Sequence, residues 1–390
     1  SVQLNIDADG GHRLKSSLGS GIEEVFTGAA LGVYDSATGL LAAEVEIPAD
    51  KLGGSMLISL PMGRTYDFYL LGNLRLMEDD GSWVLPSFPA TSAEMDSFSY
   101  RLDGGEADTG LRRESFAEVS RWGIPMCWSR KGVDPFTEGS VDIRMERLFA
   151  KLVLTVDHAG IAGTDLEAFR NGSVHIRQSN CLLKPFAPEG SKAASAADVI
   201  PVSDYESTME NGLLKDFVFY VPENRQGVLM PDNRDPAEKD IDGVDRVCGG
   251  GVSGLLTYLE FKGHMDGSRL GFDGEVVYRF FLGRDAISDF DVERNREIHV
   301  SLKFNPESVF EPDWKLDSGG LEDGREFFLS GDLAGRLPEG KEIVVRKNRP
   351  GTFGLNLVLE AGGTNRIGSA TLVDSGYEPS SLADFAWTSD

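Results

Sequence analysis

The sequence predicts an all-β protein made of tandem β-sandwich domains. Apolar side chains recur at every second position in several segments, as half-buried strands require, because successive side chains point to opposite faces of a sheet. Helical periodicity is scarce, and the strands follow one another without the βαβ alternation of a doubly wound sheet. The 46 glycines among 390 residues have no collagen-like period and suit tight turns between short strands.

Four segments carry the clearest strand pattern. Their apolar sets are Ala43, Val45 and Ile47; Val276, Tyr278, Phe280 and Leu282; Ile298, Val300, Leu302 and Phe304; and Phe353, Leu355, Leu357 and Leu359. Residues 112–122 and 164–170 are predicted as short helices in connections. The polar stretches 188–197 and 231–245 are predicted as long loops.

A change of phase predicts the first domain boundary. Val141, Ile143 and Met145 occupy odd positions, whereas the apolar residues from 148 to 156 occupy even ones. A strand cannot change phase without a bulge or a break, so the chain is expected to leave one sandwich at Glu146 and Arg147. A Pro-containing linker at 305–312 predicts a second boundary. We therefore expect domains at 1–146, 147–305 and 306–390, the last of them small and β-rich (immunoglobulin-like), either complete or continuing beyond Asp390.

The charge balance argues against nucleic acid as a partner. The chain has 63 acidic and 38 basic residues and a formal net charge of −25. A duplex or an anionic membrane surface repels such a chain on average. A soluble, self-repelling surface is the favoured interpretation, and an acidic calcium-binding surface is the alternative.

Cysteine usage and hydropathy leave the compartment open. Cys127, Cys181 and Cys248 are far apart and form no CxxC pair, so neither a disulfide framework nor a zinc site is indicated. No apolar run approaches the roughly 18 residues that a membrane-spanning helix needs. Strand-like sequence begins directly after Ser1 without a signal peptide. The chain is therefore either cytoplasmic or an exported protein that lacks its leader here.

Catalytic motifs are absent from the sequence, so we expect no enzyme, no cofactor and no metal. There is no HExxH, GxSxG, P-loop or dinucleotide fingerprint. Paired carboxylates are too numerous to single out a glycosidase site. The five histidines are scattered and are predicted to be strand or loop residues: His12, His158, His175, His264 and His299.

One acidic segment is similar to part of a calcium loop. Asp240, Asp242, Gly243 and Asp245 have some of the spacing, but the remaining ligands and the distal Glu are missing. A solvated acidic turn is favoured, with calcium binding left as the alternative.

Five strings in order resemble the fimbrillin superfamily of Bacteroidales, the FimA-like and Mfa-like surface proteins. They are residues 57–73, with a Gly-x-x-Tyr turn and a strand ending near Asn73; 123–126, a Gly-x-Pro-Met element; 146–154, a domain-two opening; 220–224, a Tyr-x-Pro-Glu-Asn element; and 290–295, a closing motif. We interpret these strings as structural ties rather than a chemical site. On this interpretation Arg147 and Lys151 are outward-facing strand charges.

The resemblance implies two transthyretin-like β-sandwiches in a lipoprotein exported to the cell surface and trimmed by an Arg-specific protease. Removing the first strand would leave a groove that a neighbouring subunit's segment fills. Here the candidate exchangeable strand is 2–6, predicted as an edge strand with Val2, Leu4 and Ile6 facing inward. The candidate processing site is Arg13, in a loop rich in Gly, Ser and charge.

The chain departs from the pattern of a fimbrial shaft subunit after Phe304, where 86 further residues follow. This favours an accessory, anchor or tip subunit on the outer membrane or fimbrium. The expected partners are other fimbrial subunits and a host or bacterial surface protein or glycan. The alternatives are a surface carbohydrate-binding sandwich lipoprotein of a glycan-uptake system and, least favoured, a glycan-active enzyme.

Overall fold

The computed structural model describes residues 2–7, 22, 25–157, 173–208, 217–267, 272–303, 313–318 and 356–357. Within these residues, strands predominate and the helices are short, which confirms the predicted all-β class. The α-helices are α1 (Ser92–Asp96), α2 (Phe116–Trp122), α3 (Pro135–Glu138) and α4 (Ile241–Cys248). The predicted helix 164–170 and nearly all of 306–390 lie outside the described residues.

The first half of the chain forms two facing sheets. One has the order β11-β1-β4: β11 (Ser140–Arg144), β1 (Val2–Asp7) and β4 (Ser55–Ile58). The other has the order β12-β10-β5-β2-β3: β12 (Glu146–Arg147), β10 (Met126–Val133), β5 (Tyr66–Gly72), β2 (Ala29–Asp35) and β3 (Leu41–Ile47). Buried side chains from both sheets form one core, so this half is a sandwich.

Strand β2 is buried along its whole length. Leu31 and Val33 face the sheet that contains β1, whereas Ala30 and Tyr34 belong to a second apolar cluster on the opposite face. A strand covered on both faces reads as a continuous apolar run rather than an alternating one. This explains why β2 lacks the clean period of β3, the edge strand beside it.

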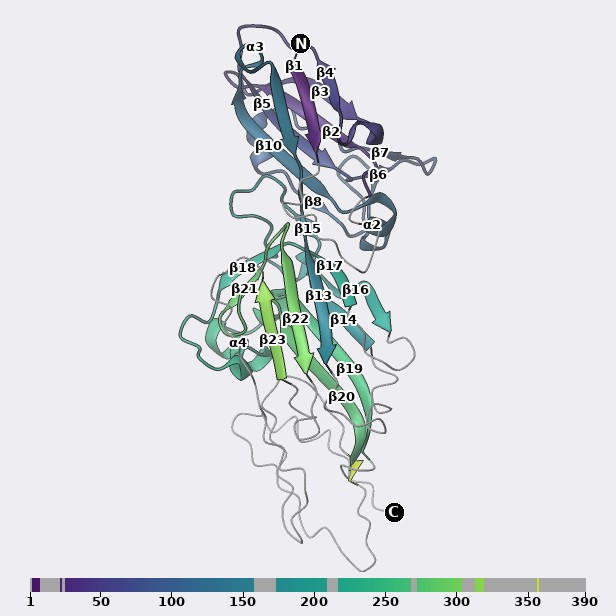
Figure 1. Ribbon diagram of the computed structural model, residues 1–390, viewed down its shortest axis with the longest axis vertical. Coiled ribbons are helices and arrows are strands. Elements are labelled where there is room, and N and C mark those ends of the chain that lie inside the picture. Colours follow the sequence, from purple (N-terminus) through teal and green to yellow (C-terminus); the bar gives the residue numbers. More distant parts are fainter. Residues whose placement is uncertain are drawn as a thin grey trace, which may run out of the picture.

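The second half also contains two larger sheets. One has the order β17-β13-β22-β23: β17 (Phe217–Pro222), β13 (Phe149–Asp157), β22 (Glu297–Lys303) and β23 (Asp313–Ser318). The other has the order β16-β14-β19-β20-β24: β16 (Val199–Thr208), β14 (Ser173–Asn180), β19 (Tyr258–Gly267), β20 (Phe272–Phe281) and β24 (Asn356–Leu357). Figure 1 shows the first pair of sheets at the end of the molecule that carries the N-terminus, and the second pair beyond it.

Three small sheets complete the described strands. β15 (Leu182–Leu183) pairs with β8 (Tyr100–Arg101), and β18 (Asn224–Val228) pairs with β21 (Asp289–Val292). The third has the order β7-β6-β9: β7 (Trp83–Val84), β6 (Leu76–Met77) and β9 (Arg112–Arg113). The β8–β15 pair links the two halves of the chain.

Two of the sequence-based predictions need correction. The helix predicted over 112–122 begins only at Phe116, because Arg112 and Arg113 belong to β9 and a capping box between Ser115 and Glu118 starts the helix. The loop predicted over 231–245 contains the start of α4, which Asp240 caps by accepting a hydrogen bond from the Gly243 backbone N–H.

The change of phase near residue 146 corresponds to a change of sheet. Val141 and Ile143 of β11 point into the core of the first sandwich. β12 then pairs with β10, and β13 enters a sheet of the second half. The chain thus passes through three sheets within 140–157, and each change resets which side chains face inward.

Candidate functional site: the first strand and the junction of the two halves

Strand β1 lies between two partners. It pairs in parallel with β11, from Gln3 opposite Ser140 to Asp7 opposite Arg144, and antiparallel with β4. The predicted edge position is therefore wrong, because β1 occupies the centre of its three-stranded sheet. Its strand character over 2–6 is as predicted.

The side chain of Leu4 anchors β1 in the core. Leu4 is fully buried and packs in the same cluster as Ile58 of β4, Val141 of β11 and Phe68 of the facing sheet. Burying a leucine stabilises a fold by about 2 kcal/mol. The side chains of Val2 and Ile6, and the whole of Arg13, lie outside the described residues.

The position of β1 defines what its loss would do. β4 and β11 would face each other across an empty slot, and each would present unpaired backbone N–H and C=O groups. The core beneath the slot would lose the side chain of Leu4. A strand of the same alternation could restore both the backbone pairing and the apolar contact.

The second feature is the junction between the halves, where the family-like strings meet. Asn73 is fully buried and has a positive φ of 61°. Its Nδ2 donates to the carbonyl oxygens of Val25 (3.0 Å) and Ile124 (2.9 Å), and its Oδ1 accepts from the Thr27 backbone N–H (2.9 Å). Gly123 is required beside it, because a Cβ there would lie 2.4 Å from the Val25 carbonyl oxygen.

Glu223 and Arg294 tie the later strings to the first half of the chain. The Glu223 side chain is 1% exposed, and its Oε2 accepts from Arg294 Nε at 2.8 Å and from the Ser191 backbone N–H at 2.7 Å. Arg294 also donates to the Pro185 carbonyl oxygen (2.7 Å) and contacts the Sγ of Cys127 (3.5 Å). A buried charge pair with this many hydrogen bonds fixes geometry more than it adds stability.

Next to this pair, Asn224 is fully buried and fully engaged. Its Nδ2 donates to the Leu255 carbonyl oxygen (2.8 Å) and to Thr257 Oγ1 (3.1 Å), and its Oδ1 accepts from the Ala193 backbone N–H (3.1 Å). These hydrogen bonds give the 220–224 string a structural role, in agreement with its interpretation as a tie. Sequence spacing gave no signal that Arg294 would reach Glu223.

Lys151 corrects a prediction of an outward-facing charge. It is 8% exposed, and its Nζ lies 4.0 Å from Glu297 Oε2. The strand β13 lies between β17 and β22 in its sheet, so both of its edges are covered. Lys151 lies opposite Tyr220 of β17 and Glu297 of β22 in the two ladders, so the side chains of both neighbours stand beside it on the same face and shield it from solvent.

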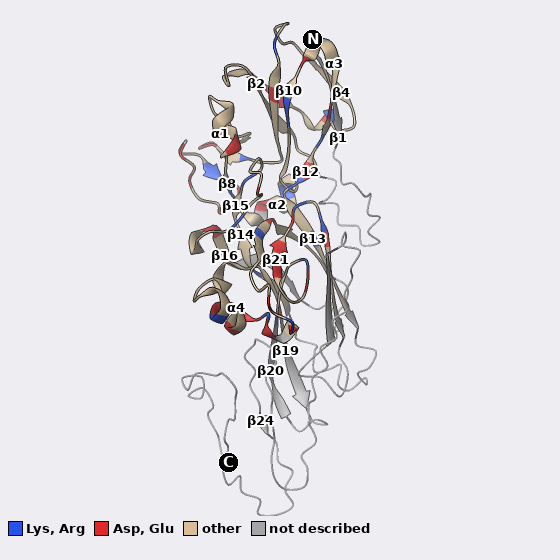
Figure 2. Ribbon diagram, turned by 90° about the vertical axis from the view of Figure 1, so that its left-hand side faces the viewer, with Lys and Arg blue, Asp and Glu red and all other residues tan. Residues whose placement is uncertain are grey.

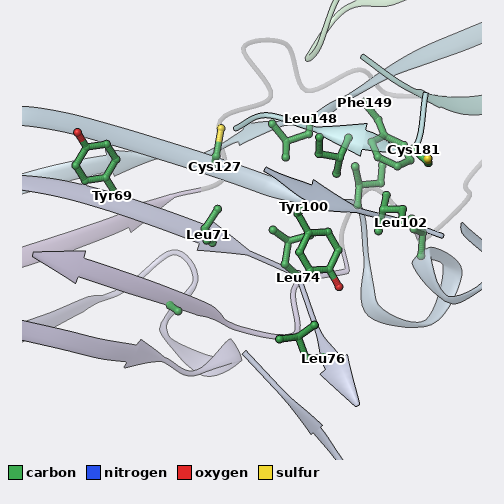
Figure 3. Packing of buried hydrophobic residues seen from close by; sticks show 14 of the residues in the cluster. Tyr69, Leu71, Leu74, Leu76, Tyr100, Leu102, Cys127, Leu148, Phe149 and Cys181 are labelled. Atoms are coloured by element: carbon green, nitrogen blue, oxygen red, sulfur yellow. The ribbon is translucent and has the colours of Figure 1, made fainter. Parts of the chain in front are cut away.

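An apolar cluster continues across the junction. Figure 3 shows Leu71, Leu74, Tyr100 and Leu102 of the first half beside Leu148, Phe149 and Cys181. The cluster also contains Leu183 and Tyr220 of the second half. The two halves therefore share buried surface in addition to the β8–β15 ladder.

The residues considered for metal or nucleophilic chemistry have contacts that suit a structural role. Asp245 accepts hydrogen bonds from the backbone N–H (3.0 Å) and hydroxyl (2.9 Å) of Ser253. Within the described part of the chain, no group of three or more His, Cys, Asp or Glu side chains is arranged to hold a metal ion. Burial raises the pKa of the Cys127 thiol to about 12, which keeps it protonated and unreactive at neutral pH.

Charge is spread over the described surface rather than gathered at one site. Figure 2 shows acidic and basic residues interspersed along both halves, with both signs on α4. No described helix has the length and apolar character needed to cross a bilayer. The geometry thus defines a β-sandwich protein whose distinctive elements are a centrally inserted first strand and a buried junction.

Comparison with known proteins gives a family match for part of the chain and similar folds among solved structures. Residues 219–302 match a family model described as a domain of unknown function, DUF4906. No curated protein matches the sequence. Among solved structures, the chain is similar to the tip fimbrial protein Mfa3 from Porphyromonas gingivalis, with C-terminal truncation, at 14% identity and a TM-score of 0.47; the match covers 81% of this chain and 99% of that one.

Two further solved structures are similar at 12% identity. A fimbrilin from Porphyromonas gingivalis has a TM-score of 0.47, with 81% of this chain and 96% of that chain covered. A fimbrial assembly protein from Parabacteroides distasonis has a TM-score of 0.44, with 85% and 98% covered.

Proposed function

We propose that the protein is a non-enzymatic cell-surface fimbrial subunit that assembles by β-strand addition. The observation that supports this most directly is the position of β1 between β4 and β11. A strand that is N-terminal in sequence yet central in its sheet can be removed by a single cut behind it. Its removal leaves a slot with two unpaired strand edges.

The proposed partners are other fimbrial subunits, whose extended segments would occupy the slot. Strand addition gives affinity through backbone hydrogen bonds and register through alternating side-chain pockets. Among the described residues, one such side-chain pocket is defined: the core position that Leu4 fills, which a side chain of the added strand would occupy. Export to the outer surface and a lipid anchor that holds the protein peripheral to the outer membrane complete this proposal.

We further propose an accessory, anchor or tip position rather than a shaft position. Most strands of the two halves precede residue 305, in support of domains at 1–146 and 147–305, although β23 and β24 from beyond that residue pair with β22 and β20 of the second half. The given sequence has 72 residues after Ser318, the end of β23. A third small β-domain there would set this subunit apart from a simple head-to-tail polymer.

Limited proteolysis with an Arg-specific enzyme tests the assembly step. We expect cleavage at Arg13, release of β1, and a cut protein that binds a synthetic peptide of residues 1–7. The same peptide with Leu4→Lys should not bind, because a charge would enter the core position. The Arg13→Gln variant, treated identically, should stay intact and should not bind either peptide.

Two results would contradict the proposal. One is an Arg13 bond that resists the protease in the folded protein. The other is a cut protein that keeps its melting temperature, stays monomeric when mixed with a partner subunit and does not bind the wild-type peptide.

A further inference from the structure

Two tryptophans from separate segments of the first half meet beside the small sheet β7-β6-β9. Trp83 belongs to β7, and Trp122 ends α2. Their ring centroids lie 5.5 Å apart with the rings tilted by 55°. Both side chains are only partly buried, so part of their aromatic surface reaches solvent. Nothing in the sequence indicated this pair, because the five tryptophans are dispersed along the chain.

Each indole carries an arginine over its ring. Arg112 lies 4.9 Å from the centroid of Trp83, and Arg121 lies 4.5 Å from the centroid of Trp122. The two arginines differ in what holds them. Arg112 donates to the Glu118 carboxylate (3.1 Å for Nη1), whereas Arg121 is exposed and makes no ion pair among the described residues. Within the described part of the chain, no ion pair therefore fixes the Arg121 guanidinium over Trp122.

Acidic residues occupy the turn that leads directly into Trp83. The turn between β6 and β7 carries Glu78, Asp79 and Asp80, all exposed, and a hydrogen bond from the Glu78 backbone N–H to the Ser82 carbonyl oxygen closes it. The site thus combines two partly exposed indoles, each with a guanidinium over one face, with the exposed carboxylates of the turn that precedes Trp83. A few polar groups around aromatic surface are what a ligand site needs for orientation and specificity.

We propose that Trp83, Trp122 and Arg121 form a binding site for a neutral glycan. The C–H face of a pyranose ring carries positive partial charge and matches the negative face of an indole. Its hydroxyls can accept from Arg121 and donate to the carboxylates of the β6–β7 turn. An anionic ligand fits less well, because three acidic side chains line this turn and the whole chain carries −25. The site goes beyond the proposed assembly function, since it needs neither cleavage nor strand exchange.

Nuclear magnetic resonance of the intact chain with ¹⁵N-labelled tryptophan tests this site. The probes are cellohexaose, chitohexaose and mannohexaose as neutral glycans, and a hyaluronan hexasaccharide as the acidic arm. We expect at least one neutral probe to shift the indole N–H signals of Trp83 and Trp122, with a Kd at or below the millimolar range. The signal of Trp128, which packs against the core of the first sandwich, should not move.

Substitutions assign the effect to the site. Trp83→Ala should weaken binding about tenfold, and Trp83→Phe, which keeps an aromatic ring, should retain part of the affinity. An unchanged Trp128 signal verifies that the two Trp83 variants are folded. Trp128→Ala is the matched control: unchanged Trp83 and Trp122 signals in the absence of ligand verify its fold, and it should bind as the wild type does.

Three results would overturn the proposal. The first is the absence of any shift at about 10 mM of every neutral probe. The second is a response confined to the other tryptophans, or equal binding by Trp83→Ala and the wild type. The third is tighter binding of the hyaluronan probe at these two tryptophans, which would assign the site to acidic glycans instead.

Discussion

At the scale of single residues, Glu114 is a carboxyl group buried in an unfavourable environment. It is fully buried, and neither carboxylate oxygen has a hydrogen-bond partner among the described residues. Burial, with a contribution from the negative charge of Glu118, raises its pKa to about 9, and the Arg75 guanidinium offsets this only in part. The carboxyl group is therefore protonated at neutral pH in the folded protein, which avoids an isolated buried charge.

This predicts a pH-dependent stability that Glu114→Gln removes. The folded pKa of about 9 lies above the ordinary value of 4.5, so the wild type loses stability as pH rises from 4.5 towards 9. The variant should match the wild type at pH 4 and exceed it by about 3 kcal/mol in free energy of unfolding at pH 7. Urea titrations at both pH values measure this difference.

Glu189→Gln is the control, because Glu189 is exposed and its substitution should leave the pH profile of the wild type unchanged. A variant whose free energy of unfolding falls in parallel with the wild type from pH 4 to pH 8 would show that Glu114 is not the group responsible.

At the scale of elements, β1 and β4 show how the position of a strand decides how much a side chain contributes to the free energy of unfolding. Leu4 on β1 is fully buried, whereas Leu57 on the neighbouring edge strand β4 is 70% exposed. Both are leucines in paired strands, and Leu57 lies opposite Gln3 in the ladder. Only Leu4 fills space between the two sheets. It therefore stabilises the fold both by leaving water and by packing in the core, whereas Leu57 does not.

We therefore predict that Leu4→Ala lowers the free energy of unfolding by about 2 to 5 kcal/mol. Leu57→Ala should change it by less than about 0.5 kcal/mol, as expected for an exposed position. Denaturant unfolding followed by tryptophan fluorescence measures both. Equal effects of the two substitutions would mean that β1 does not occupy the core of the first sandwich.

At the scale of the whole molecule, the two halves are joined by buried contacts at the junction. The apolar cluster, the β8–β15 ladder and the Glu223–Arg294 pair all connect residues of the first half with residues of the second. Interfaces of this apolar kind oppose relative motion of the parts that they join. We expect a single calorimetric unfolding transition for residues 1–305 within the full chain.

The Arg294→Met variant tests the junction. It leaves the Glu223 carboxylate buried without its cation, which should cost about 3 to 5 kcal/mol. Adding Glu223→Gln should recover part of this loss, since the uncompensated charge is gone. Arg225→Met is the control: the Arg225–Glu293 pair is partly exposed, so its loss should cost less than about 1 kcal/mol. Scanning calorimetry measures all four proteins, and a loss for Arg294→Met no larger than for Arg225→Met would contradict the role of the pair.

The sequence by itself determined the class of fold and the place where the chain changes sheet. Alternation at 43–47 and 298–302 is a local property of a half-buried strand, and β3 and β22 lie where it predicts them. The phase change before Leu148 is equally local, because a strand cannot turn its apolar face outward within one sheet. Asn73 and Gly123, which belong to two of the family-like strings, have the positive φ angles that favour asparagine and glycine.

Only the tertiary structure decided which strands are neighbours and which side chains are covered. β1 was expected at an edge, but β11 pairs with it from far along the chain, and pairing between distant segments leaves no periodic signal in either. Lys151 is buried because Tyr220 and Glu297, its partners on the two neighbouring strands, flank its side chain. Trp83 and Trp122 meet because α2 and the β7 strand pack together, and Arg294 reaches Glu223 in the same way. Such contacts depend on how distant segments fold back on each other, which local sequence patterns do not encode.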